Sequence, residues 1–355
     1  MLDFTIEHVS TEHDYMAAFN LALSVFSPQN SSIDYGANKF FTWDEDPYFK
    51  YENILLAKYK GIPAGLIRIV PRELFRVDKV FSVAGISSVC LLPEYRGKGL
   101  SVILMDEALR YCKGLGYDIS LLFARRNADY YYTRFGFHGI SSYSQISVKK
   151  PQQLNVPNRY SFADGDLNLL EIYAQAYDKT YANCFGKFQR TPEYWKFLFV
   201  SLSYKPHCHN RIIKFNGRAI GYIISDSKKI LEIATTEDIF GKEFILFLME
   251  NLEISTGDSL QFEMLPQHSM VKQLYGLDVT FQSRGCIFGG HMLKVINEEN
   301  VRLKLNPPSL DFGLKNRKDI LSHAETCDLL RVTYPTLQSN SDSLIPFDIS
   351  SIDHF

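Results

Sequence analysis

The chain has 355 residues, enough for two domains with sizeable cores; 46% of its residues are hydrophobic and 22% are charged, as in ordinary globular proteins. The formal net charge of −2 argues against a nucleic-acid-binding surface. No apolar run is long enough to span a membrane, the N-terminus does not resemble a signal peptide, and the six cysteines show neither metal-ligand nor disulfide spacing. We therefore expect a cytoplasmic protein with free thiols, no nucleic-acid or membrane partner and no bound metal.

The first 150 residues are expected to form one mixed α/β domain. Two strand-like runs at 54–59 and 64–70 flank the turn that contains Gly61, which predicts a β-hairpin. The elements expected next are a strand at 82–91, a helix from Leu100 to Gly114, a strand at 119–124, a short helix at 130–134 and a closing strand at 142–148.

A glycine-rich turn follows the strand that ends at Leu91 and precedes the helix that begins at Leu100. Gly97 and Gly99 allow the backbone to fold so that successive N–H groups converge, and the helix adds its positive end at the same place. Arg96 and Lys98 supply two cations. This combination predicts a site for phosphate oxygens.

The residues 96–101 resemble the pyrophosphate loop, R/Q-x-x-G-x-G/A, of the GNAT superfamily of acetyl-CoA-dependent N-acetyltransferases, although Ser101 stands where that pattern has Gly or Ala. The residues 89–93 resemble the family's central strand, and 130–137 resemble its closing Tyr…Gly-Phe motif. The resemblance implies transfer of acetyl from acetyl-CoA to a primary amine by direct attack in a ternary complex. It assigns contacts with the pantetheine arm to Val89, Cys90 and Leu91. It assigns contacts with the pyrophosphate to Arg96, Gly97, Lys98, Gly99, Leu100 and Ser101. Tyr132 and Thr133 are expected to lie beside the cofactor thiol.

The residues 151–289 look like a degenerate copy of the first domain. The hairpin at 58–67 aligns with 214–223, the turn and helix at 97–105 align with 241–249, and the motif at 135–137 aligns with 275–277. In this copy Phe240 replaces Arg96 and Glu243 replaces Gly99, so a carboxylate would point at a bound pyrophosphate. We expect one cofactor site in each chain.

A narrower resemblance is to the Eis (enhanced intracellular survival) subgroup, carried by 84–89, by 191–195 and by the degenerate copy. That subgroup combines an active GNAT domain, an inactive domain of the same fold and a C-terminal sterol-carrier-like domain. The resemblance implies two tandem GNAT-like domains, with residues 290–355 as a short C-terminal segment that corresponds to a trimmed third domain. It also implies self-association into a homo-oligomer.

Tyr132 is the candidate general acid, because a phenol is well matched to protonating a departing thiolate. Eis-type enzymes place that tyrosine where this chain has Phe137, so the proton comes either from Tyr132 or from water. By resemblance, the carboxylate of the last residue, Phe355, is the candidate base. The acidic loop at 42–47 is a candidate to attract a cationic amine.

The sequence does not separate a polyamine, an aminoglycoside-like compound, an amino sugar or a protein lysine as the acceptor. Two other functions remain open: a transferase that uses another donor, either a longer acyl-CoA or a charged tRNA, and an acyl-CoA-binding regulator or scaffold without turnover.

Overall fold

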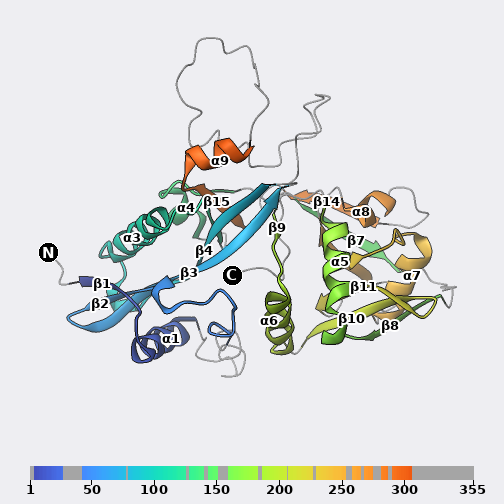
Figure 1. Cartoon of the computed structure of the whole chain (residues 1–355), viewed down its shortest axis with the longest axis horizontal. Coiled ribbons are helices and arrows are strands. Elements are labelled where there is room, and N and C mark those ends of the chain that lie inside the picture. Colours follow the sequence, from blue (N-terminus) through green and yellow to red (C-terminus); the bar gives the residue numbers. More distant parts are fainter. Residues whose placement is uncertain are drawn as a thin grey trace, which may run out of the picture. The chain divides into compact units, whose positions relative to one another are not determined.

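A computed structural model describes residues 4–26, 42–76, 79–124, 128–139, 143–150, 159–182, 186–205, 207–226, 229–252, 258–264, 268–274, 281–286 and 290–305 (Figure 1). These residues divide into two compact units, and their strands form two β-sheets. The first unit takes the chain as far as Gly139 and again from Gly290, and the second takes Ile140 to Gly289. Among the described helices, none combines the length and the apolar character needed to cross a membrane.

The first unit contains β1 (Phe4–His8), α1 (Glu12–Phe26), β2 (Ile54–Tyr59), β3 (Ile62–Arg76), β4 (Lys79–Leu91), α3 (Leu100–Gly114), β5 (Ile119–Phe123), α4 (Asp129–Thr133), β6 (His138–Gly139), β15 (His291–Val295) and α9 (Glu298–Leu305). Its sheet follows the order β1-β2-β3-β4-β5-β15-β6. The pair β4–β5 is parallel, and the other neighbours are antiparallel.

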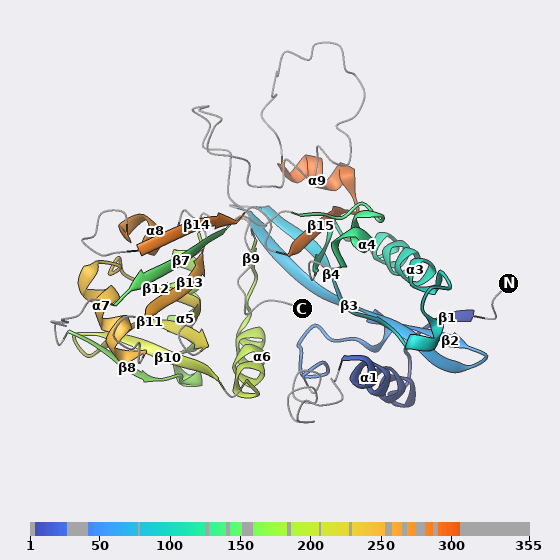
Figure 2. The same ribbon diagram turned by 180° about the vertical axis from the view of Figure 1, so that it is seen from behind.

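Helices cover both faces of this sheet, with α1 and α3 on opposite sides (Figures 1 and 2). Leu100, Leu104 and Met105 of α3 join one hydrophobic cluster with Ile67 and Ile69 of β3. A second cluster joins the buried face of α1 to the other face of the sheet. Ile103 of α3 and Leu115, which follows the helix, are exposed because they lie off its packed face.

The hairpin β2–β3 turns through Lys60 and Gly61, whose φ angles of 50° and 78° are both in the left-handed region. Two consecutive positive φ angles define the type I′ turn, whose twist matches that of the flanking strands. The hairpin predicted from the sequence is therefore confirmed, and the strands are longer than the apolar runs alone indicated.

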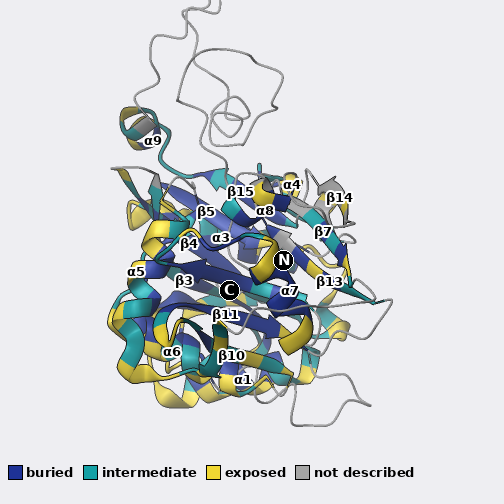
Figure 3. Ribbon diagram, turned by 90° about the vertical axis from the view of Figure 1, so that its right-hand side faces the viewer, coloured by how far each residue is buried: buried dark blue, intermediate teal, exposed yellow. Residues whose placement is uncertain are grey.

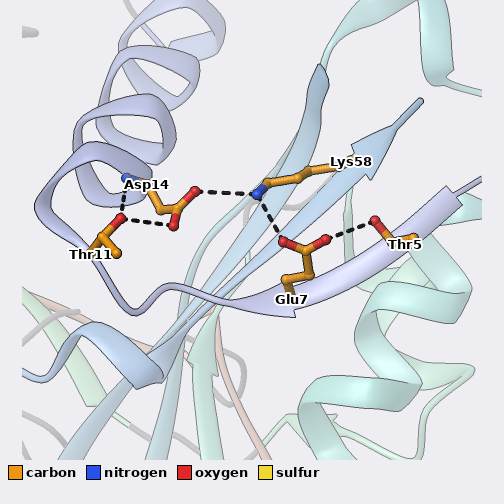
Figure 4. Close-up of polar contacts among 5 residues, drawn as sticks. All are labelled: Thr5, Glu7, Thr11, Asp14 and Lys58. Carbon is orange, nitrogen blue, oxygen red and sulfur yellow. Dashed lines mark hydrogen bonds and ion pairs between the residues drawn. The ribbon is translucent and has the colours of Figure 1, made fainter. Parts of the chain in front are cut away.

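Lys58 of β2 connects the strand β1 to the beginning of α1 (Figure 4). Its Nζ donates to Glu7 at 2.8 Å and to Asp14 at 3.2 Å. Thr11 caps the helix by accepting from the Asp14 backbone N–H at 3.1 Å and donating to the Asp14 carboxylate. These bonds lower the pKa of both carboxyl groups and fix α1 at this edge of the sheet.

The second unit contains β7 (Tyr143–Lys149), β8 (Tyr160–Asp164), α5 (Leu170–Thr180), β9 (Lys187–Phe188), α6 (Pro192–Ser203), β10 (Cys208–Phe215), β11 (Arg218–Asp226), β12 (Lys229–Thr235), α7 (Lys242–Asn251), β13 (Ser259–Met264), α8 (Ser269–Leu274) and β14 (Phe281–Cys286). Its sheet follows the order β8-β10-β11-β12-β13-β7-β14, again with one parallel pair, β12–β13. In both units the central strands are largely buried, as β4 and β11 show in Figure 3.

The two sheets share details that go beyond strand order. The hairpin β10–β11 turns through Asn216 and Gly217, with φ angles of 49° and 80°, and has a register shift after Ile213 where β2 has one after Ala57. In both sheets a glycine, Gly65 or Gly221, lies where an added Cβ would come within 2.1 Å of the next strand. These shared features support the internal duplication expected from the sequence.

One strand differs from the expectation. We expected the strand at 142–148 to close the first sheet, but β7 pairs with β13 and β14 of the second. The corresponding position in the first sheet, between β5 and β6, is taken by β15, which follows the second unit in the chain. Local sequence specifies that a segment is extended and which face is apolar, but it does not specify the neighbouring strand.

Candidate functional site

The strand β4 separates from both of its neighbours near its end. Its register with β3 passes from Leu66 opposite Cys90 to Arg68 opposite Ser87, so β4 carries an extra residue there. Ser88, in this bulge, has a φ of 53°. In the described part of the chain, β5 pairs with β4 only as far as Ile86, although β4 continues to Leu91. The end of β4 therefore presents backbone polar groups on the side that faces away from β3.

The side chains at this end of β4 alternate between the two faces of the sheet. Val89 and Leu91 pack on the α3 cluster, and Cys90 packs on the α1 cluster. Burial raises the pKa of the Cys90 thiol to about 12, so this thiol stays protonated at neutral pH and is a poor nucleophile. The three residues predicted to contact the pantetheine arm thus offer backbone groups rather than reactive side chains.

The loop between β4 and α3 has the conformation that a phosphate site requires. Gly97 and Gly99 have φ angles of 73° and 80°, and an added Cβ at either position would meet no atom within 4 Å. Gly99 caps α3, and among the described residues none accepts a backbone hydrogen bond from the N–H groups of 97–101. The free amides, the helix dipole and the open space in front of both glycines fit a diphosphate.

Two cationic side chains flank this loop, and both are exposed. Arg96 Nε donates to the carbonyl of Leu91 at 3.2 Å, and Lys98 Nζ lies 5.6 Å from the centre of the Tyr95 ring. Leu100, by contrast, is fully buried and anchors the first turn of α3 in the core. The predicted pyrophosphate residues are therefore brought together, with backbone groups at the centre and cations at the rim.

The helix α4 is tied to this loop by Tyr131, a residue that the sequence analysis did not single out. The Tyr131 hydroxyl donates to the carbonyl of Ser101 at 2.7 Å, which connects α4 to the first turn of α3. Nothing in the spacing distinguished this residue from its two neighbouring tyrosines. Thr133, a predicted cofactor contact, is exposed, and its hydroxyl donates to the carbonyl of Tyr130 at 3.1 Å.

Tyr132 is partly buried against the α3 cluster. Its ring lies 5.0 Å from Tyr131 and 6.2 Å from Phe137, and its hydroxyl bonds to no other described residue. Burial raises its pKa to about 12, so the phenol is protonated at any physiological pH. Phe137 is a fully buried core residue. Phe355, the candidate base, lies outside the described residues.

One of the three carboxylates in the acidic loop at 42–47, a candidate to attract a cationic amine, is already paired within the protein. Asp46 is buried and accepts from both terminal nitrogens of Arg72, at 3.1 and 2.7 Å. Asp44 and Glu45 are exposed, and Asp44 lies beside the hydroxyl of Tyr15, whose pKa is raised mainly by burial. The neutralised Asp46 therefore cannot attract a cation.

A second arginine, Arg68, lies beside this ion pair and was not singled out from the sequence. Its guanidinium carbon is 4.9 Å from the centre of the Trp43 ring. Its Nε is shut off from solvent and has no hydrogen-bond partner among the described residues. The available signal was a single charge inside the apolar run 64–70.

Residues 8–140 match the sequence model of the Acetyltransferase (GNAT) domain. No curated protein matches the chain at the sequence level. The fold is shared with a GCN5-related N-acetyltransferase from Anabaena variabilis, at 18% identity and a TM-score of 0.61 over 83% of this chain and 73% of that one. A GCN5-related N-acetyltransferase from Kribbella flavida aligns at 14% identity and a TM-score of 0.61, over 84% and 73% of the two chains.

Eis1 from Mycobacterium abscessus also shares the fold, at 13% identity and a TM-score of 0.57, over 85% of this chain and 75% of that one. Each of these alignments covers more of this chain than the 8–140 segment, so the likeness extends over both units. At such identities the likeness is one of fold.

Proposed function

We propose that this protein moves acetyl from acetyl-CoA to a primary amine. Its residues 8–140 match the GNAT acetyltransferase domain, and the GNAT family transfers acyl groups from CoA. The observation that carries this proposal is the loop at 96–101. Its two left-handed glycines, its free amides and the open space before them lie directly after a bulged strand. A diphosphate held at the loop would direct the pantetheine arm along the unpaired side of β4.

The proposed reaction is direct attack in a ternary complex. The amine nitrogen forms a bond to the thioester carbonyl carbon, the C–S bond breaks, the amine loses a proton and the CoA thiolate gains one. Backbone N–H groups at the bulge near Ser88 would polarise the carbonyl oxygen. The protonated, buried Cys90 favours direct attack over a covalent cysteine intermediate.

Tyr132 is proposed to protonate the leaving thiolate. With its pKa at about 12 the phenol keeps its proton until a strong base forms beside it, and a thiolate expelled in a partly buried site is such a base. Phe355 is proposed as the base by resemblance alone. Homo-oligomer formation and cytoplasmic location also stay proposals.

The second unit is proposed to bind no cofactor. The helix α7 begins at Lys242, the position that corresponds to Lys98, so residues equivalent to the loop are wound into the helix. Its cap residue, Gly241, has a φ of −80° rather than the left-handed value of Gly99. Phe240 is buried in the second core where the first unit exposes Arg96.

A non-catalytic acyl-CoA-binding role is the second candidate. It is favoured by Phe137, which places a buried phenyl ring where the Eis subgroup has its acid, and by the unbonded hydroxyl of Tyr132. Release of free CoA thiol, measured with acetyl-CoA and longer acyl-CoA donors against a broad panel of amines, separates the two functions. Amine-dependent release that is fastest with acetyl-CoA supports the acetyltransferase. Tight binding without release supports the regulator.

A further inference from the structure

The guanidinium of Arg68 lies on the sheet face opposite to α3, close to the bulge of β4. Arg68 is paired in register with Ser87, the residue before Ser88. Its neighbour on the same face, Leu66, belongs to the α1 cluster, whereas Ile67 and Ile69 belong to the α3 cluster. The phosphate loop leads into α3, so a cofactor bound there would lie on the α3 side of the sheet. The acceptor would then approach a thioester at the bulge from the α1 side.

On this region of the α1 face, Arg68 has no hydrogen-bonded carboxylate among the described residues. Arg68 and Arg72 supply two guanidinium groups there, and Asp46 supplies one buried carboxylate. Both oxygens of Asp46 are bonded to Arg72, and Arg68 makes no hydrogen bond or ion pair with another described residue. Partial burial of a cation without its own partner is costly unless a ligand supplies the anion.

The terminal nitrogens of Arg68 are available to such a ligand. Only Nε is fully buried without a partner, and the side chain as a whole is half-buried. The stacking on Trp43 fixes the plane of the guanidinium, so its two-pronged edge has a defined direction. A fixed guanidinium edge matches the two oxygens of a carboxylate.

The second unit shows the same kind of arrangement with the anion present. Arg190 is stacked on Trp195 at 4.6 Å and donates to both oxygens of Glu232 at 2.7 Å. Glu232 lies on β12, the strand that corresponds to β4, next to a register shift with β11. The position on β11 that corresponds to Arg68 is Ile224, which is buried, so the fold itself does not require an arginine there.

We propose that Arg68 binds a carboxylate of the acceptor, so that the substrate is an amine that also carries a carboxylate, and that Arg68 determines this specificity. The inference rests on the proposed acetyltransferase function. In the second unit Glu232 fills the comparable position from within the chain, and in the first unit the substrate supplies the anion. The acceptor nitrogen and carboxylate are then held together beside the bulge.

The test compares ω-amino acids with their own carboxamides, which differ in charge but keep the same amine and chain. The acceptors are 3-aminopropanoate, 4-aminobutanoate and 6-aminohexanoate, each with its amide, at saturating acetyl-CoA. For the chain length that fits, we expect kcat/KM of the carboxylate to exceed that of the amide by about 10- to 100-fold, the worth of a hydrogen-bonded charge pair. Arg68→Gln should bring that ratio to about one, and Arg68→Lys, which lacks the planar fork, should give an intermediate ratio.

Arg218→Gln, which removes an exposed arginine of the second unit, is the matched control and should leave the ratio unchanged. A wild-type ratio near one at every chain length would overturn the inference, as would a ratio that Arg68→Gln does not change. If Arg68→Gln fails to fold, the ratio for Arg68→Lys decides. A protein that acetylates neutral amines without preference refutes only this inference, whereas one that neither binds nor consumes acetyl-CoA refutes the proposed function as well.

Discussion

Glutamate substituted for Gly99 should abolish tight binding of acetyl-CoA without unfolding the domain. Gly99 has a φ of 80° and open space before it, so the new carboxylate would project toward the position proposed for the diphosphate. Two unit charges about 5 Å apart repel by about 2 to 3 kcal/mol at an effective dielectric constant of about 20 with physiological screening. The dissociation constant should therefore rise roughly 30- to 150-fold.

The substitution also forces a side chain into the left-handed region, which costs about 1 to 2 kcal/mol of stability wherever it occurs. Gly116 provides a matched control, because its φ is 77°, an added Cβ there meets no atom within 4 Å, and it follows the opposite end of α3. Gly116→Glu should lose similar stability in chemical denaturation and keep its affinity for acetyl-CoA. Isothermal titration calorimetry should give one site per chain in the wild type.

Two results would refute this reasoning. If Gly99→Glu binds acetyl-CoA within about threefold of the wild type, the loop does not hold the diphosphate, since the repulsion is worth at least tenfold more. If both glutamate variants lose affinity equally, the effect comes from backbone strain and not from charge at the loop.

Four further outcomes are expected. Tyr132→Phe should lower kcat by about 100-fold or more with little change in acetyl-CoA affinity, and an unchanged kcat would assign the proton to water. His268 is buried and its pKa is lowered to about 4, so its contribution to stability is complete above pH 6.5 and is lost as the pH falls toward 4. Urea unfolding should show a loss of about 3 kcal/mol from this group, which His268→Gln should largely abolish. Arg190→Met, which leaves the buried Glu232 without its ion-pair partner, should cost about 3 to 5 kcal/mol in the same assay, and adding Glu232→Gln should restore part of that loss. A fragment of residues 1–150 should fail to fold because it lacks β15, and a well-dispersed NMR spectrum of that fragment would contradict the strand assignment.

The phosphate loop was predictable from the sequence because its signals are local. A glycine with positive φ has few substitutes, and the strand before it and the helix after it are visible as apolar patterns. The hairpin at Lys60 and Gly61 was predictable for the same reason. Each of these features is determined within about ten residues of chain.

Features that depend on tertiary pairing were not predictable. The sequence shows three arginines on β3 and three acidic residues at 44–46, but it does not show that Asp46 pairs with Arg72 and leaves Arg68 without a hydrogen-bonded carboxylate among the described residues. Likewise, Tyr131 and Tyr132 are adjacent and chemically identical, and only the fold directs one hydroxyl to Ser101. Burial and register decide these roles, and neither is a property of a short segment.

The place of β15 in the chain explains why the first unit, which has the phosphate loop, needs the second unit, which lacks it. β15 contributes Met292, Leu293 and Val295 to the first unit, all nearly fully buried. At about 1.5 to 3 kcal/mol for each buried side chain, their loss would remove an amount comparable to the whole stability of a typical domain. The chain reaches β15 only after it has passed through every strand of the second sheet, beginning with β7. The first sheet is completed only by a strand that follows the second unit in the chain, whereas the strands of the second sheet all lie within Ile140–Gly289. The second unit therefore stays necessary to the first whatever its own surface binds.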